Sequence, residues 1–235
     1  MMYFKQYGAQ RTGTNYLKRL MEINFEQVTV FGSVLGWKHG MYETSNGYQH
    51  KCHSHEQWIK DKTREDGRVY SVDNYPLKHT PEQLHQACDN LHYLISCKDP
   101  YAFVVSYKRF RANKQPWNED KVTRWIHTYL QQYARWRRLY ERVPDKCIMV
   151  DYEQLICNRD VVLSTIKSKF DLTQKHEDFR NEQRVVGAST DHGLIIKKSD
   201  FDTTYYTDKQ YMQEIPDNIR KTITRCLHNI STAMR

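Results

Sequence analysis

The chain has 235 residues, a length that suits one large hydrophobic core. Hydrophobic residues make up 39% and aromatic residues 13% of it, which excludes an intrinsically disordered protein. The 36 Lys and Arg residues exceed the 28 Asp and Glu residues and give a formal charge of +8, which favours anionic partners such as nucleic acid, phosphorylated or sulfated small molecules, or an acidic surface.

Strand and helix patterns alternate along the chain. Residues 3–7 predict a buried strand, and a loop at 8–13 leads into a helix that starts near Thr14, with its apolar face at Leu17, Leu20, Met21 and Phe25. Further strands are expected at 28–30, 34–37, 68–72, 91–97 and 147–150. Further helices are expected at 81–88, 101–110, 118–142, within 152–170 and after Pro216. This order indicates an α/β three-layer sandwich with a mainly parallel central sheet.

Two stretches do not follow this alternation. Residues 40–66 are polar and are expected to be irregular or broken helix, and 184–206 lack clear periodicity. The chain shows no repeat, no low-complexity linker, no apolar run of about 18 residues and no signal-peptide pattern. Its cysteines form no CxxC pair and are expected to be reduced thiols. These features predict one domain, residues 1–235, of a soluble cytoplasmic protein without a membrane partner.

The loop between the first strand and the first helix has the features of an anion site. Its backbone N–H groups and the positive end of the helix dipole can point at the same anion. Gly13 allows close backbone approach, Arg11 supplies charge, and Thr12 and Thr14 supply hydroxyl donors. A glycine turn capped by threonines before a helix has the same residues, so this bland alternative stays open.

Gly8 and Gly13 have the spacing of the Walker A pattern GxxxxGK[ST]. However, Thr14 stands at the lysine position and Asn15 at the position of the Mg²⁺-binding hydroxyl. The loop therefore predicts a phosphate-containing group donor that needs no Mg²⁺. It disfavours a P-loop kinase or NTPase.

The sequence QRTGTNYL at 10–17 resembles the 5′-phosphosulfate loop of sulfotransferases that use PAPS (3′-phosphoadenosine 5′-phosphosulfate), roughly [KR]-[ST]-G-[ST]-[ST/N]-x-L. The resemblance implies a P-loop nucleotide-binding-like fold with PAPS at the carboxyl ends of the parallel strands. It implies that seven residues bind the donor: Gln10, Arg11, Thr12, Gly13, Thr14, Asn15 and Tyr16.

A second segment, 94–110, resembles the 3′-phosphate element of the same family. A base at the end of a strand and a hydroxyl two turns into the next helix can converge on one phosphate. Here Lys98 and Ser106 take these positions around Asp99-Pro100. Lys98 replaces the commoner Arg and gives a point charge instead of a bidentate fork. Alone, this segment is an ordinary strand-to-helix turn; its spacing from the first loop makes the pair a strong signal.

Two weaker matches follow. Residues 149–155 resemble the family's xYExL segment, to which we assign a structural role and none in catalysis. The basic loop at 187–199 is a candidate cover for the 3′-phosphate through Lys197 and Lys198, or else a solvated basic loop. The resemblance thus implies transfer of a sulfuryl group to a hydroxyl or amine of a carbohydrate or small-molecule acceptor, with PAP as product and no metal. A catalytically inactive descendant is an open alternative.

Such a transfer needs charge stabilisation at the leaving 5′-phosphate and a general base for the acceptor. Arg11 is expected to supply the first, His39 the second, and Lys38 an additional contact to the sulfuryl group. Glu43 and Asp73 are the runners-up for the base. A lone histidine in a loop is more often a surface or hydrogen-bonded residue. The segments 40–66 and 184–206 are candidate walls or lids of the acceptor site.

Two other features compete with this hypothesis. The run 50–55 concentrates His and Cys residues, but it lacks a second ligand pair at the usual zinc spacing, which favours an exposed polar loop. The helix 117–142 interleaves arginines with Trp and Tyr residues and suits single-stranded nucleic acid. A helix with one core face and one solvated basic face explains the same pattern, so a nucleic-acid partner is disfavoured.

Overall fold

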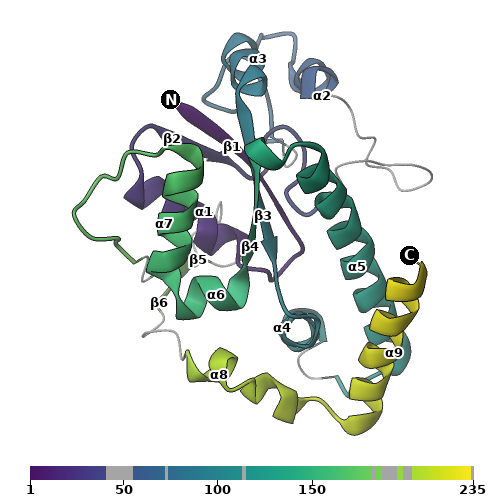
Figure 1. Ribbon diagram of the computed structural model, residues 1–235. Coiled ribbons are helices and arrows are strands. Elements are labelled where there is room, and N and C mark those ends of the chain that lie inside the picture. Colours follow the sequence, from purple (N-terminus) through teal and green to yellow (C-terminus); the bar gives the residue numbers. More distant parts are fainter. Residues whose placement is uncertain are drawn as a thin grey trace.

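The computed structural model describes most of the chain (Figure 1). The described residues are 1–40, 55–71, 74–112, 115–181, 184–186, 195–197 and 203–233, with only the backbone described at 184–186, 195–197 and 230–233. Among these residues, four strands form a parallel sheet in the order β2-β1-β3-β4. The strands are β1 (Met2–Gly8), β2 (Val28–Phe31), β3 (Leu91–Cys97) and β4 (Cys147–Asp151). The expected α/β class with a mainly parallel sheet is confirmed.

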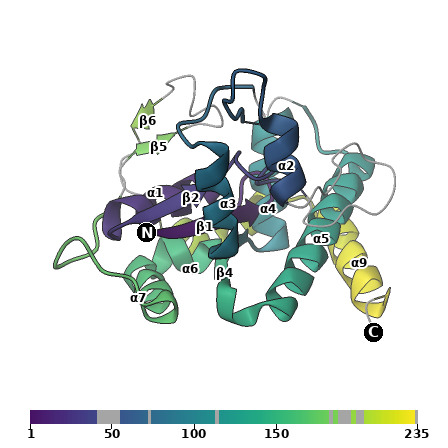
Figure 2. The same ribbon diagram turned by 90° about the horizontal axis from the view of Figure 1, so that it is seen from above.

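Helices cover both faces of this sheet (Figures 1 and 2). One face carries α1 (Thr14–Asn24), α6 (Tyr152–Cys157) and α7 (Arg159–Phe170). The other carries α4 (Pro100–Ala112), α5 (Glu119–Arg142) and α9 (Asp217–Ala233). Side chains alternate between the faces of a strand, so Leu94 packs with the first group and Ile95 with the second.

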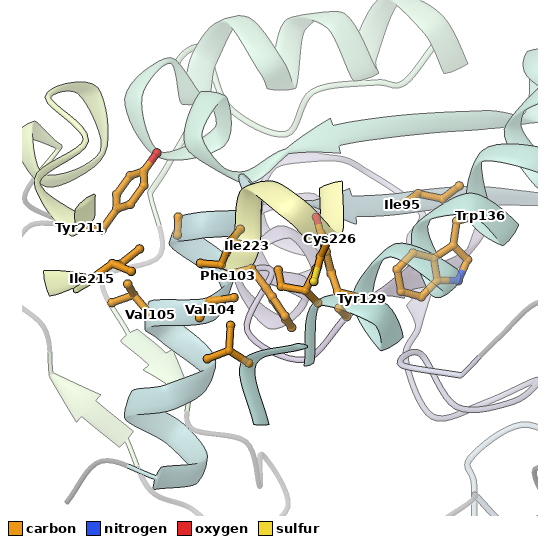
Figure 3. Packing of buried hydrophobic residues seen from close by; sticks show 14 of the residues in the cluster. Ile95, Phe103, Val104, Val105, Tyr129, Trp136, Tyr211, Ile215, Ile223 and Cys226 are labelled. Atoms are coloured by element: carbon orange, nitrogen blue, oxygen red, sulfur yellow. The ribbon is translucent and has the colours of Figure 1, made fainter. Parts of the chain in front are cut away.

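The long helix α5 shows why the sequence folds in this way. Its buried residues recur at helical spacing and form one face: Val122, Ile126, Tyr129, Trp136 and Leu139. Figure 3 shows Trp136 beside Ile95 of the sheet and Tyr129 near Cys226 of α9. Full burial of one such large side chain stabilises the fold by about 1.5–3 kcal/mol. The opposite face exposes arginines, as predicted for a helix with a core side and a basic solvated side: Arg124, Arg137, Arg138 and Arg142.

The register brings the carboxyl ends of three strands together. Gly8 pairs with Ser96, and Ser96 pairs with Val150. The chain passes from β1 to β2 on one side and continues with β3 and β4 on the other, so the order reverses between β1 and β3. Ligands of open parallel sheets bind outside the carboxyl ends at such a switch point. The loop after β1 and Lys98 after β3 both lie there.

The remaining elements lie around this core. They are α2 (His55–Lys62), α3 (Pro81–Asp89), η1 (Pro144–Lys146), β5 (Arg184–Val186), β6 (Ile195–Lys197), α8 (Thr204–Thr207) and η3 (Gln210–Glu214). The expected start of α3 is confirmed: Thr80 and Gln83 form a capping box, and Pro81 is the first residue of the helix. None of the described helices combines the length and apolar character needed to cross a membrane.

Two predicted strands are wrong. Residues 34–36 form bends and 37 is irregular, because the carbonyls of Val34 and Gly36 turn inward to the ammonium group of Lys5, as does that of Gly32 before them. The described part of 68–72 contains only isolated bridges, from Val69 to Thr63 and from Tyr70 to Pro76. The apolar side chains of these segments, such as Leu35 and Val69, still pack in the core, but their backbones are not part of the sheet.

Candidate functional site

The loop after β1 holds two residues in the left-handed region. Arg11 has φ 71° and Gly13 has φ 76°. Gly13 is the N-cap of α1, and a Cβ at this position would lie 2.2 Å from Cδ2 of the Tyr152 ring. Only glycine fits both the backbone conformation and the close approach of the tyrosine. The glycine of the predicted loop therefore has a packing reason as well as a conformational one.

The first turn of α1 has the charge character of an anion site. Its N-cap residue, Gly13, makes no side-chain cap hydrogen bond, and the first turn contains no acidic residue. By contrast, α5 is capped by Asn118 and has Glu119 and Asp120 in its first turn. The positive dipole end of α1 is thus compensated neither by a side chain of the N-cap residue nor by a carboxylate of the first turn.

One of the predicted donor-binding side chains, that of Thr12, holds the loop itself. The Thr12 hydroxyl donates to the Ala9 carbonyl at 2.8 Å, and the Thr12 side chain is buried. Gln6 donates from Nε2 to the Thr14 carbonyl at 2.7 Å. These two bonds fix the backbone of the loop, and the Thr12 hydroxyl is already engaged within it.

Tyr16 also has an internal partner. It is buried on α1, and its hydroxyl donates to Oδ1 of Asn181 at 2.7 Å. Gln10 lies at the exposed side of the loop, where its Oε1 accepts from Arg111 at 3.1 Å. The guanidinium group of Arg11 lies 5.3 Å from the centre of the Phe110 ring on α4.

Lys98 is enclosed at the end of β3. Its side chain is only 4% exposed, with Nζ 4.2 Å from the centre of the Tyr152 ring and 5.1 Å from that of Tyr206. Nζ is also 3.5 Å from the Arg11 carbonyl and 3.5 Å from the Tyr206 hydroxyl. The Tyr129 hydroxyl bonds both the N–H and the carbonyl of Lys98, at 3.0 and 2.5 Å. Lys98 is therefore rigidly placed beside the loop, with Tyr206 lying over its charge.

Burial lowers the pKa of Lys98 to about 7. The carboxylate of Glu153 opposes this shift, whereas the cations Arg11 and Arg109 add to it. Burial also raises the pKa of Glu153 to about 7. Three cations thus gather near one point, and an anion there would relieve their mutual repulsion.

Asp99 connects this lysine to the start of α4. Its Oδ1 accepts from the N–H groups of Tyr101 at 2.9 Å and Ala102 at 3.1 Å. Its own N–H donates to Glu153 at 3.1 Å. Pro100 is the first residue of α4, where its missing N–H costs nothing. The strand-to-helix turn predicted at Asp99-Pro100 is confirmed.

We expect Asp99→Ala to lower the free energy of unfolding by about 1 kcal/mol, because two N–H groups of α4 lose their acceptor. Asp99→Asn should retain most of the stability, since an amide oxygen can accept the same bonds. Urea unfolding of the two variants and the wild type measures the difference. Equal losses in both variants would show that the carboxylate charge, and not the cap, is what matters.

Ser106 lies half-buried on α4, eight residues after Lys98. It stands one helical turn before Phe110, and residues four apart share a helix face. Because Phe110 contacts Arg11, this face of α4 lies toward the loop. The predicted pairing of Lys98 and Ser106 on one phosphate stays a prediction.

The segment 37–40 returns to the end of β1. The Gly8 N–H donates to the Lys38 carbonyl at 3.0 Å, and Nδ1 of His39 lies 2.7 Å from the Gly8 carbonyl. Lys38 donates from Nζ to Oδ1 of Asn15 in the first turn of α1. On the other side, Gln132 of α5 donates to the His39 carbonyl at 2.8 Å. Lys38, His39 and the anion loop are therefore brought together.

The hydrogen bond determines the tautomer of His39. A carbonyl oxygen only accepts, so Nδ1 carries the proton and Nε2 keeps its lone pair. Burial lowers the pKa of His39 to about 4, and the cations Lys38 and Lys5 lower it as well. His39 is accordingly neutral at pH 7, which is the form a general base requires.

Other predicted residues fall partly or wholly outside the described residues. Glu43, Asp73 and Lys198 lie outside them, as does most of the histidine- and cysteine-rich run 50–55. For Lys197 the structure describes the backbone, which pairs with Arg184. Across the described ranges, no three His, Cys, Asp or Glu side chains cluster as metal ligands would.

Sequence reasoning missed part of this neighbourhood. Tyr152 and Glu153 were given a structural role only, yet they contact Gly13 and Asp99 and surround Lys98. Their position directly after β4 was the available signal, because the ends of neighbouring parallel strands meet. Tyr206 ends the segment 184–206, a candidate wall or lid, and Arg109 stands in the segment 94–110, but only packing brings Tyr206 of α8 over Lys98.

Comparison of the chain with protein-family models and with curated proteins finds no match. The residues and their geometry therefore carry the functional argument.

Proposed function

We propose that this chain is a sulfotransferase that moves a sulfuryl group from PAPS to a hydroxyl or amine of a carbohydrate or small-molecule acceptor. The observation that supports this most is the meeting, at the switch point between β1 and β3, of an uncapped anion loop and the buried cation of Lys98. The proposal includes a P-loop-like fold, which the strand–loop–helix arrangement of 2–24 supports.

The two elements suit the two ends of the donor. The 5′-phosphosulfate would lie on the backbone N–H groups at the start of α1, with Arg11 supplying charge. The 3′-phosphate would lie near Lys98 and Ser106. Tyr206 would have to move aside for this contact, because its hydroxyl lies 3.5 Å from Nζ of Lys98. Thr14 and Asn15 offer no Walker lysine or Mg²⁺-binding hydroxyl, which supports a donor other than a Mg²⁺ nucleotide.

In the proposed transfer, neutral His39 acts as the general base. The acceptor oxygen forms a bond to sulfur while the bond from sulfur to the 5′-phosphate oxygen breaks, with charge spread over the equatorial oxygens. Nε2 of His39 takes the acceptor proton, and Arg11 with the loop N–H groups stabilises the negative charge that develops on the leaving phosphate. Lys38, held by Asn15, would neutralise charge on the sulfuryl oxygens.

We expect adenosine 3′,5′-bisphosphate (PAP) to bind the wild type with micromolar affinity in EDTA. Arg11→Ala and Lys98→Ala should each weaken this binding at least tenfold, a loss of about 1.4 kcal/mol, because each removes a cation from the phosphate positions. Isothermal titration calorimetry measures the affinities. Lys60→Ala, at an exposed position on α2, is the matched control and should bind like the wild type.

Absence of binding by a folded wild-type protein would contradict the proposal. Binding with the predicted losses would justify a screen of carbohydrate and small-molecule acceptors for sulfuryl transfer from PAPS.

One observation favours a second candidate, the binding of single-stranded nucleic acid. Arg111 lies 4.8 Å from the ring centre of Phe110, which is 39% exposed, and Lys108 lies 5.1 Å from that of Trp117. Cations beside exposed rings suit stacked bases and phosphates. Titration with a single-stranded oligonucleotide tests it; Lys108→Ala, which removes the cation beside Trp117, should weaken that binding while leaving PAP binding unchanged.

A further inference from the structure

Lys5 is a cation in the middle of the buried strand β1, and the proposed chemistry does not use it. Its side chain has no exposed surface. Its Nζ donates to three backbone carbonyls, those of Gly32 at 2.8 Å, Val34 at 2.9 Å and Gly36 at 2.6 Å. Three acceptors match the three N–H groups of an ammonium ion, whereas a neutral amine has only two.

The segment 32–36 is shaped around this cation. Leu35 has φ 57° and Gly36 has φ 100°, so two successive residues are left-handed. A non-glycine residue in this region stores strain that the surroundings must compensate. Alternate carbonyls converge on one point, as the ligands of a bound monovalent cation do, and the ammonium group of Lys5 occupies that point. We call these three carbonyls the carbonyl clamp.

The clamp lies directly before the residues of the proposed transfer site. Lys38 and His39 follow Gly36 and are bonded to Gly8, the last residue of β1. The same strand thus holds the segment at both ends, through Lys5 within the strand and Gly8 at its end. Without the ammonium group, one buried and two partly buried carbonyls would lose their donor, and the segment would have to rearrange to find others.

We propose that Lys5 is a positioning residue whose ammonium group acts as a tethered cation, holding the segment 32–36 and thereby His39 and Lys38 against the anion loop. The consequence for catalysis rests on the sulfotransferase function proposed above, whereas the clamp itself does not.

Charged and titratable groups face Lys5 from several elements. Burial lowers its pKa, and the cations Lys38 and Lys18 lower it further. Lys5 in turn contributes to the lowered pKa values of His39 and of His55 on α2. The three carbonyls favour the ammonium form, which we take to be the form present at neutral pH.

The test uses the nucleotide-free protein, so its outcome does not depend on whether PAP binds. Histidine side-chain NMR follows the titration of His39 in the wild type, in Lys5→Ala and in the near-isosteric Lys5→Met. We expect both variants to raise the His39 pKa, because the ring becomes less buried and a nearby cation is lost. The hydrogen bond from Nδ1–H to Gly8, which favours the charged ring, should weaken at the same time and offset part of this rise.

Chemical rescue distinguishes the effect of the Lys5 ammonium group from the effect of the packing of its side chain. Ammonium chloride should enter the emptied clamp in Lys5→Ala and return the His39 titration toward that of the wild type. Tetramethylammonium chloride at the same concentration has no N–H to donate and should have no effect. Lys60→Ala, which removes an exposed lysine, is the control for a general change in charge.

An unchanged His39 titration in folded Lys5→Ala and Lys5→Met would overturn the proposal. If neither variant folds, the wild type still decides, through ¹⁵N detection of the Lys5 side chain. Slowly exchanging ammonium protons at pH 7 support the clamp, and a neutral amine at that pH refutes it.

Discussion

Gly13→Ala should lower the free energy of unfolding by about 3 kcal/mol and abolish measurable PAP binding. The left-handed conformation at φ 76° costs an alanine about 1–2 kcal/mol. The new Cβ would also lie 2.2 Å from Cδ2 and 2.5 Å from Cε2 of Tyr152, and forcing such overlap in a packed region typically costs about 1–3 kcal/mol. Because the Tyr152 ring packs against Lys98, moving it displaces the second phosphate element as well.

Gly67→Ala is the matched control for this experiment. Gly67 has φ 77°, but nothing lies within 4 Å of its added Cβ, so this variant has the conformational cost alone, about 1 kcal/mol. Urea unfolding measures the loss in free energy of unfolding for both variants, and the difference between the two losses is the steric contribution at Gly13. Tyr152→Leu in the Gly13→Ala background should recover part of it, as a double-mutant cycle would measure. Equal losses for Gly13→Ala and Gly67→Ala would show that Tyr152 yields freely to the new methyl group.

The affinity for PAP should fall above pH 7 and approach a tenfold loss per pH unit, which gives about a fiftyfold loss between pH 7 and pH 9. Burial lowers the pKa of Lys98 to about 7. A bound phosphate dianion raises that pKa again, because it favours the charged form. Below pH 7 the ammonium form is already present; above pH 7 binding must take up a proton, and its free energy becomes less favourable.

Of the neighbouring groups, Glu153 has two opposed effects, because its carboxylate repels an anion but also favours the ammonium form of Lys98. Glu153, whose pKa burial raises to about 7, becomes negative over the same range and further disfavours an anion. His39, with a pKa of about 4, stays neutral throughout. The second ionisation of a phosphate monoester, near pH 6, is complete before the tested range begins.

Calorimetry at pH 7, 8 and 9, in two buffers of different ionisation enthalpy, gives both the affinity and the number of protons taken up. Lys98→Arg is the control, because a guanidinium group stays charged and most of the pH dependence should disappear. A wild-type affinity that is constant from pH 7 to pH 9, without proton uptake, would show that Lys98 does not face the bound phosphate.

Much of the fold could be read from local signals in the sequence. Thr80 with Pro81, Asn118 with the apolar stripe of α5, and Gly13 before Thr14 each specify a helix start through contacts between near neighbours in the chain. Such contacts depend on few residues, so the sequence alone predicts them. The alternation of these helices with apolar strands likewise predicted the α/β class and the parallel sheet.

The segment 34–37 marks the limit of such reasoning. Its apolar residues suggest a strand, but its conformation depends on Lys5, which is 27 residues from Gly32 in the chain. A lysine in a buried strand carries no local indication of which carbonyls it will meet. The bends of this segment, and with them the positions of Lys38 and His39, follow from that long-range contact.

In the candidate site, too, local sequence predicts some properties and long-range packing sets the others. Residue type and spacing around Gly13 and Lys98 set the charge, the hydroxyls and the backbone freedom available to bind an anion, so local sequence indicates these residues. Their chemical state depends instead on how distant segments pack around them. The parallel register places Tyr152 and Glu153 beside Lys98, and α8 places Tyr206 over it. Burial by these distant segments shifts the pKa values of Lys98 and Glu153 to about 7, since desolvation depends on everything packed around a group.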